Sequence, residues 1–153
     1  MREELTIDEM YPLIAETVQN GGVFRFYPHG TSMLPMLVQG EDSIELGKAE
    51  TIDVGDVLFY RRKSGQFVLH RLIEKRGNTL TMCGDNQMAL EYGILPEQVL
   101  AKLVGFYKGE TYHTVDEPEY LAYQHRMVRR FPFYRRNPKI YSIWRKIKHL
   151  IKK

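Results

Sequence analysis

The chain has 153 residues, 43% of them hydrophobic, and this length predicts one globular domain with a sizeable core rather than two domains. Its single cysteine, Cys83, excludes an internal disulfide framework. The net charge of +3 is unevenly divided, because all 19 acidic residues lie at or before Glu119, together with only half of the 22 Lys and Arg residues. The sequence therefore predicts an acidic body followed by a basic tail.

Residues 1–22 contain a predicted helix that packs on the body. Thr6 and Glu9 match a capping box, and apolar residues recur at helical spacing until Asn20-Gly21-Gly22 ends the pattern. Pro12 is expected to shift the start of this helix or to bend it. Neither a secretory leader nor a run long enough to span a bilayer is recognisable, so we expect a cytoplasmic protein.

Residues 23–115 are predicted to form a mostly antiparallel β domain, because short runs rich in Val, Ile, Leu, Phe and Tyr alternate with turn residues. The predicted strands cover residues 23–27, 43–47, 56–62, 66–75, 79–83 and 99–107. Lys63-Ser64-Gly65 and Gly77-Asn78 predict hairpin turns. These turns would place His70 in the middle of a strand, on the face shared by Val68 and Leu72.

Residues 116–153 are predicted to form a basic helical tail, in which Pro118 and Pro138 each open a helix. The second helix has an apolar stripe that includes Trp144, flanked by basic residues such as Lys146 and Lys148. We interpret these three residues as membrane contacts to anionic headgroups at the inner face of the cell membrane. A solvated helix face and a nucleic-acid-binding arm are the less favoured alternatives.

Residues 28–37 are too apolar for an ordinary surface loop and too rich in Gly and Pro for the interior of a helix or strand. Ser32 lies here between the flexible Gly30 and the rigid Pro35, a setting that can fix its hydroxyl and leave its backbone N–H free. Acyl transfer needs both groups at one carbonyl. His70 is the candidate general base, since imidazole has an unperturbed pKa of about 6.5.

Four sequence boxes occur in order: residues 30–35 (Gly-Thr-Ser-Met-Leu-Pro), residues 55–59 (Gly-Asp-Val-Leu-Phe), His70-Arg71 and residues 84–86 (Gly-Asp-Asn). Together they resemble the signal peptidase I family, within the wider group that includes LexA-like self-cleaving repressors. The resemblance covers residues 25–107. It implies a mainly β, α+β fold of the signal peptidase/LexA type, which we expect here without the family's usual transmembrane anchor.

The resemblance also implies site residues. With His70 at the base position, the chain resembles the Ser/His branch of the group, in which an acidic residue orients the histidine. Asp85 matches one acid of that branch and Glu91 replaces the other, so the choice between them stays open. The resemblance places Gly30, Thr31, Met33 and Pro35 in the loop and substrate cleft. Gly30 stands where some family members have an oxyanion-stabilising serine, so we assign no side-chain oxyanion donor, and Thr31 is the alternative.

We therefore expect a serine endopeptidase that cleaves an extended peptide or protein substrate, with Ser32 as the nucleophile and His70 as the base. A catalytically silent peptide-binding or regulatory module of the same fold is the alternative. The histidines lack a metal-ligand spacing and no nucleotide-binding motif is present, so we predict neither a metal nor another cofactor. The oligomeric state stays open.

Overall fold

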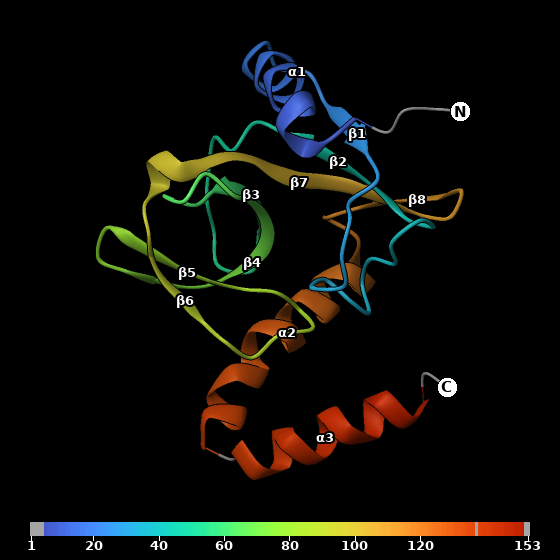
Figure 1. Cartoon of the computed structure of the whole chain (residues 1–153), viewed down its shortest axis with the longest axis vertical. Helices are drawn as coiled ribbons and strands as arrows, with labels where there is room; N and C mark the ends of the chain where they lie inside the picture. The colour runs from blue at the N-terminus through green and yellow to red at the C-terminus, as the bar shows by residue number, and fades with distance from the viewer. Residues whose placement is uncertain (1–4, 137, 152–153) are drawn as a thin grey trace.

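An eight-stranded antiparallel sheet forms the body of the protein in a computed structural model (Figure 1). The structure describes residues 5–136 and 138–151, and the side chains in those ranges except residues 131–136, 138, 141, 144–145, 148–149 and 151. The strands are β1 (Phe24–Phe26), β2 (Ser43–Gly47), β3 (Val57–Arg61), β4 (Phe67–Arg76), β5 (Thr79–Cys83), β6 (Glu91–Ile94), β7 (Val99–Lys108) and β8 (Thr111–Thr114). The helices are α1 (Ile7–Gln19), α2 (Pro118–Arg136) and α3 (Pro138–Ile151), and a 3₁₀ turn spans Pro96–Gln98. The fold is therefore mainly β, of the α+β class.

The strands follow the order β1-β2-β7-β3-β4-β5-β6, and β8 pairs with β7. Both predicted hairpin turns are confirmed. The first joins β3 to β4, with the Arg62 amide donating to the Gln66 carbonyl at 2.8 Å. The second joins β4 to β5 through Gly77, whose φ of 56° suits a tight turn. This register puts His70 directly opposite Leu58.

Strand β3 separates two hydrophobic cores, because successive side chains point to opposite faces of a strand. Val57 and Phe59 join the larger core, and Leu58 and Tyr60 join the smaller one, which also receives Val68 of β4. His70 has the same parity in β4 as Val68, whereas Arg71 faces the other side. His70 and Arg71 are adjacent in β4 but therefore face opposite sides of the sheet.

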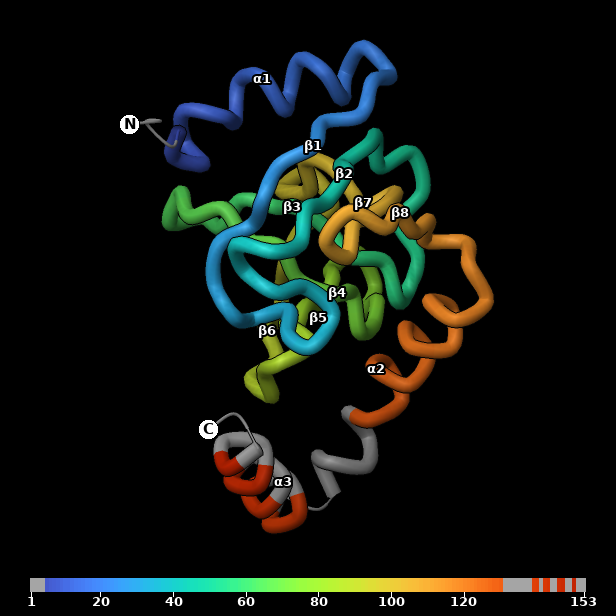
Figure 2. The backbone as a smooth tube through the Cα atoms, turned by 90° about the vertical axis from the view of Figure 1, so that its right-hand side faces the viewer, coloured from blue at the N-terminus to red at the C-terminus, as the bar shows by residue number. Residues whose placement is uncertain are grey.

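Helices α1 and α2 pack at opposite ends of the body, as two perpendicular views show (Figures 1 and 2). The predicted capping box of α1 is confirmed, and the helix continues through Pro12 to Gln19. Its buried side chains, Ile14 and Val18, belong to the larger core. Tyr120 in the first turn of α2 belongs to the same core and is 6% exposed, so the chain stays packed on the body beyond Glu119.

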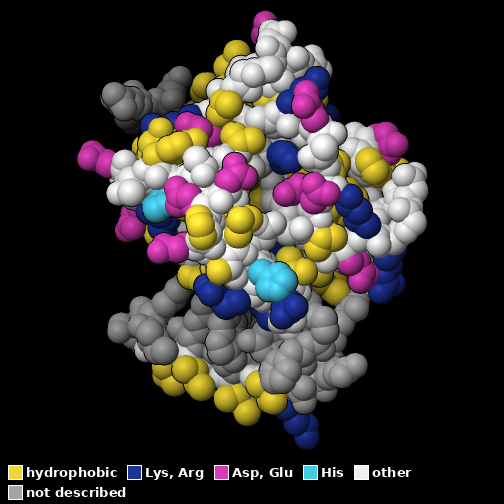
Figure 3. All heavy atoms as spheres, turned by 180° about the vertical axis from the view of Figure 1, so that it is seen from behind, with side chains coloured by type: hydrophobic (Ala, Val, Ile, Leu, Met, Phe, Trp, Pro, Cys, Tyr) yellow, Lys and Arg dark blue, Asp and Glu magenta, His cyan; other side chains and the backbone are white. Residues whose placement is uncertain are grey.

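Helix α3 lies beyond α2 at the edge of the molecule (Figure 1). Its described apolar side chains are exposed, and Figure 3 shows hydrophobic side chains gathered along this lower rim. They are Ile140, Ile143, Ile147 and Leu150. Within the described parts of the chain, no helix is both long and apolar enough to cross a membrane.

Candidate active site

Ser32 lies in the loop that joins β1 to β2, and its neighbours anchor this loop in the larger core. Met33 and Leu37 are buried there, and the Leu37 amide donates to the Met33 carbonyl at 3.1 Å. Gly30 has a φ of 95°, which favours glycine, and its amide donates to the Gln39 side chain at 2.8 Å. Ser32 itself is half-buried between these anchors.

The turn at residues 84–86 holds the Ser32 loop from the other side. The Asn86 amide donates to the Ser32 carbonyl at 2.8 Å, and the Asn86 side chain donates to the Thr31 carbonyl at 3.0 Å. A Cβ atom added to Gly84 would lie 2.6 Å from the Ser32 carbonyl oxygen, so only glycine permits this close approach. The Gly-Asp-Asn box therefore fixes the backbone of Ser32.

His70 is a buried side chain of β4, with 5% of its surface exposed. Its Nδ1 atom lies 3.3 Å from the Tyr60 hydroxyl of β3. Burial, together with the positive charge of Arg62, lowers the pKa of His70 from 6.5 to about 4, although the negative charges of Glu91 and Asp85 oppose this shift. The imidazole is therefore neutral at pH 7, the state that a general base requires.

Ser32 and His70 line one pocket of about 260 Å³. A second pocket of about 470 Å³ borders His70 and is lined by Arg62 and residues 86–91. Among the described residues, no hydrogen bond joins Ser32 to His70. Catalytic hydrogen bonds often tighten only when substrate binds, so the shared pocket is compatible with a catalytic pair.

The pocket follows an open edge of the sheet. Residues 67–70 of β4 pair with β3 on one side, and β5 begins to pair with β4 only at Arg71. No described strand covers the other side of residues 67–70. Because these residues also line the pocket with Ser32, a strand added to this edge would pass beside the side chains of Ser32 and His70.

Asp85 is committed to a buried ion pair rather than to His70. Its two oxygens accept hydrogen bonds from Arg71 Nε at 2.7 Å and Nη2 at 2.8 Å, and the Tyr123 hydroxyl of α2 donates at 2.8 Å. Arg71 is fully buried and also donates to the Gly55 carbonyl at 2.7 Å. This cluster ties β4, the turn after β5 and α2 together.

No protein-family model, curated protein or solved structure matches this chain.

Glu91 lies at the start of β6 and faces the Tyr60 side of His70. It accepts hydrogen bonds from Arg62 Nε at 2.9 Å and Nη2 at 2.6 Å, and from the Tyr60 hydroxyl at 3.2 Å. The sequence left open whether Asp85 or Glu91 orients His70. Of these two, Glu91 reaches His70 through one intervening hydroxyl, that of Tyr60. No described group of three His, Cys, Asp or Glu side chains gathers as a metal site.

Sequence reasoning overlooked Tyr60, Arg62 and Tyr123, and it named Arg71 in the His70-Arg71 box without its ion pair to Asp85. The contact of Tyr60 with His70 could have been predicted from the sequence, since the predicted hairpin turn sets a register in which Tyr60 is opposite Val68, two residues from His70. Tyr123 gave no such signal, because its contact with Asp85 joins residues 38 apart in sequence. The pocket residues Met33 and Gly30 were identified, whereas Thr31 and Pro35 do not line the Ser32 pocket.

Of the three residues expected to contact a membrane, Lys146 is exposed on α3. The side chains of Trp144 and Lys148 lie outside the described residues.

Proposed function

We propose that the protein is a serine endopeptidase of the signal peptidase-like group, with the corresponding antiparallel β fold. The observation that carries this proposal is that one pocket is lined by both Ser32 and a neutral His70 beside an open strand edge. The four sequence boxes support the same assignment independently.

In the proposed reaction, Ser32 Oγ attacks the carbonyl carbon of the scissile peptide bond while His70 accepts the hydroxyl proton. The Ser32 backbone N–H donates to the developing oxyanion. The C–N bond then breaks, His70 gives its proton to the leaving amine, and an acyl-enzyme remains. A water molecule activated by His70 hydrolyses this ester and frees Ser32. Asn86 keeps the Ser32 backbone in place throughout.

The substrate in this proposal is an extended peptide that pairs with residues 67–70. An unpaired edge offers backbone N–H and C=O groups for strand addition. The bound strand then crosses the pocket that Ser32 and His70 line, which sets its scissile carbonyl beside the hydroxyl. Side-chain selectivity comes from the pocket walls on either side of this strand.

The test is mass spectrometry of a diverse peptide library incubated with wild type, Ser32→Ala and His70→Ala near neutral pH. Wild type is expected to produce cleavage products that both variants lack. Ser142→Ala is the matched control, because Ser142 is an exposed serine of α3 away from the pocket, and it should cleave like wild type. Equal products from Ser32→Ala and wild type would refute the role of Ser32.

A peptide-binding module without turnover is the second candidate. The missing Ser32–His70 hydrogen bond and the low pKa of His70 favour it, since a weakly basic imidazole is a poorer proton acceptor. This candidate predicts that library peptides bind wild type and Ser32→Ala equally and leave intact. Binding without cleavage would select it over the peptidase.

We also propose that α3 binds an anionic membrane surface, at the inner face of the cell membrane. Its exposed apolar residues face outward, and residues 120–153 carry eleven Lys and Arg and no acidic residue. Each basic residue near an anionic surface contributes roughly 1 kcal/mol. The apolar row would enter the interface beside these charges.

Liposome sedimentation tests the membrane proposal. Vesicles with phosphatidylserine should retain the full chain, whereas K139E/K146E should be released, because both exposed lysines lie on α3. Lys48→Glu, an exposed body lysine, is the control and should sediment like wild type. A shortened chain that lacks only α3 should end at Arg136, because Tyr120 and Tyr123 of α2 belong to the folded body. Sedimentation unaffected by K139E/K146E would refute the proposal.

A further inference from the structure

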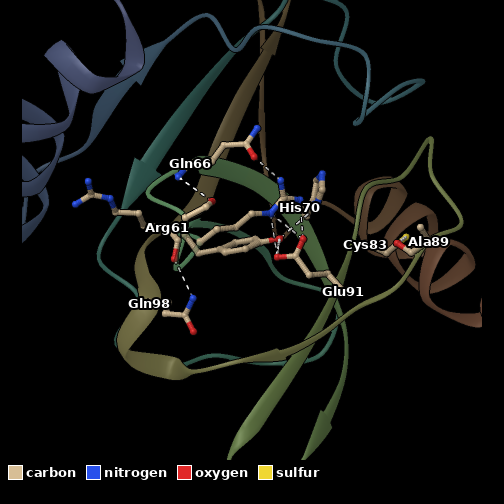
Figure 4. A network of polar contacts seen from close by, with 10 residues as sticks. Arg61, Gln66, His70, Cys83, Ala89, Glu91 and Gln98 are labelled. Atoms are coloured by element: carbon tan, nitrogen blue, oxygen red, sulfur yellow. Dashed lines mark hydrogen bonds and ion pairs between the residues drawn. The ribbon is translucent and has the colours of Figure 1, made fainter.

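Tyr60 joins His70 to Glu91 through a single phenol oxygen. The side chain of Tyr60 is fully buried in the smaller core. Its oxygen lies 3.3 Å from His70 Nδ1 and 3.2 Å from Glu91 Oε1. Figure 4 shows His70 and Glu91 as parts of one polar network.

The number of protons that each group can donate sets the direction of each hydrogen bond in this network. Arg62 donates to Glu91 Oε2 through Nε and Nη2, so the Glu91 oxygens act as acceptors. Tyr60 has one hydroxyl proton and gives it to Glu91. Its oxygen can then only accept toward His70, so the remaining hydrogen bond requires a proton on His70 Nδ1.

We propose that Tyr60 and Glu91 are positioning residues that hold His70 as its Nδ1–H tautomer. The lone pair of the ring then lies on Nε2, which becomes the atom that accepts the Ser32 proton. A carboxylate acting through a tyrosine thus replaces direct contact between an acid and the histidine. The role of Tyr60 and Glu91 in catalysis rests on the proposed function, whereas the Nδ1–H tautomer of His70 does not.

The surrounding charges agree with this arrangement. The charged groups near His70 are Arg62, Glu91 and Asp85. Asp85 is occupied by Arg71 and Tyr123, so it does not contact the ring. Burial and the negative charge of Glu91 raise the pKa of Tyr60, so its hydroxyl keeps the proton through the neutral range. When His70 is protonated during turnover, Tyr60 links the imidazolium to the Glu91 charge.

Long-range ¹H–¹⁵N correlation NMR of the His70 ring at pH 7 tests the proposal without requiring catalysis. In wild type, Nδ1 should show the shift of a protonated nitrogen and Nε2 that of an unprotonated one. Tyr60→Phe keeps the ring packing and removes the hydroxyl, so the two tautomers should mix. Glu91→Met removes the acceptor, so Tyr60 should turn its proton to Nδ1 and reverse the pattern.

Tyr112→Phe is the matched control, because Tyr112 also donates to a carboxylate, that of Glu45 at 3.0 Å, but on β8. It should leave the His70 spectrum unchanged. An Nε2–H signature in wild type would overturn the proposal, as would unchanged spectra in both the Tyr60 and Glu91 variants. Near-UV circular dichroism checks folding, and Glu91→Met at its half-buried position carries the test if Tyr60→Phe does not fold.

A kinetic arm separates this inference from the proposed function. With a cleaved library peptide, Tyr60→Phe should lower kcat about fivefold at unchanged KM, the effect of one neutral hydrogen bond. A tautomer signature without any turnover would refute the peptidase and keep the network. Turnover with an unchanged kcat in Tyr60→Phe would refute the positioning role of Tyr60 in catalysis and keep the peptidase.

Discussion

Replacing Arg71 with Met should destabilise the protein by about 3–5 kcal/mol, the usual cost of removing one partner from a buried ion pair. Arg71 is 0% exposed and Asp85 is 2% exposed, so water cannot replace the lost guanidinium. Asp85 would lose two of its three hydrogen bonds and keep the one from Tyr123. Urea unfolding followed by far-UV circular dichroism measures the change in the free energy of unfolding.

Two further variants isolate the cause of this destabilisation. R71M/D85L removes both charges and should be more stable than Arg71→Met, since no unpaired carboxylate stays buried. Arg76→Met breaks the ion pair with Glu74, which is partly exposed, and should change stability by less than about 1 kcal/mol. A loss below about 1 kcal/mol for Arg71→Met would refute the reasoning.

Three other predictions follow from the site. The pKa of His70 is about 4 in the folded protein and 6.5 in the unfolded chain, so the unfolded chain binds the proton first as the pH falls. The free energy of unfolding should therefore drop by roughly 3 kcal/mol from pH 7 to 4. In urea titrations, His70→Asn should lack this part of the pH dependence. The acid limb of kcat/KM should bend near pH 4, and a bend near 6.5 would contradict the lowered pKa of His70. Gly84→Ala should displace Ser32 and lower kcat in peptide assays; Gly47→Ala, whose Cβ would lie 2.9 Å from Val104, should spare kcat if crowding near Ser32 is the cause.

Features governed by neighbouring residues were predictable from the sequence. The capping box of α1 depends on residues three positions apart, and both hairpin turns depend on two or three residues. Those turns fixed the register of β3, β4 and β5, so the face of His70 could be predicted. Strands β6 and β8 were missed because neither contains a run of the apolar residues that marked the other strands: β6 includes Glu91 and Gly93, and Tyr112 is the single aromatic residue of β8.

The polar partners across the fold were not predictable in this way. Arg71 lies directly after His70, and only the alternation of β4 sends it into the opposite core. Its contact with Tyr120 spans 49 residues and depends on how α2 packs. The sequence could name Asp85 and Glu91 as acids, but the choice of partner for each depends on this tertiary packing.

The open edge at residues 67–70 also bears on how copies of the protein meet. An unpaired edge offers the same backbone groups to a strand from another copy as to a peptide, so it is a template for aggregation. Neither a proline nor a lysine interrupts it. A peptide bound along this edge competes with such self-association, so ligands found in the library should also keep concentrated solutions clear.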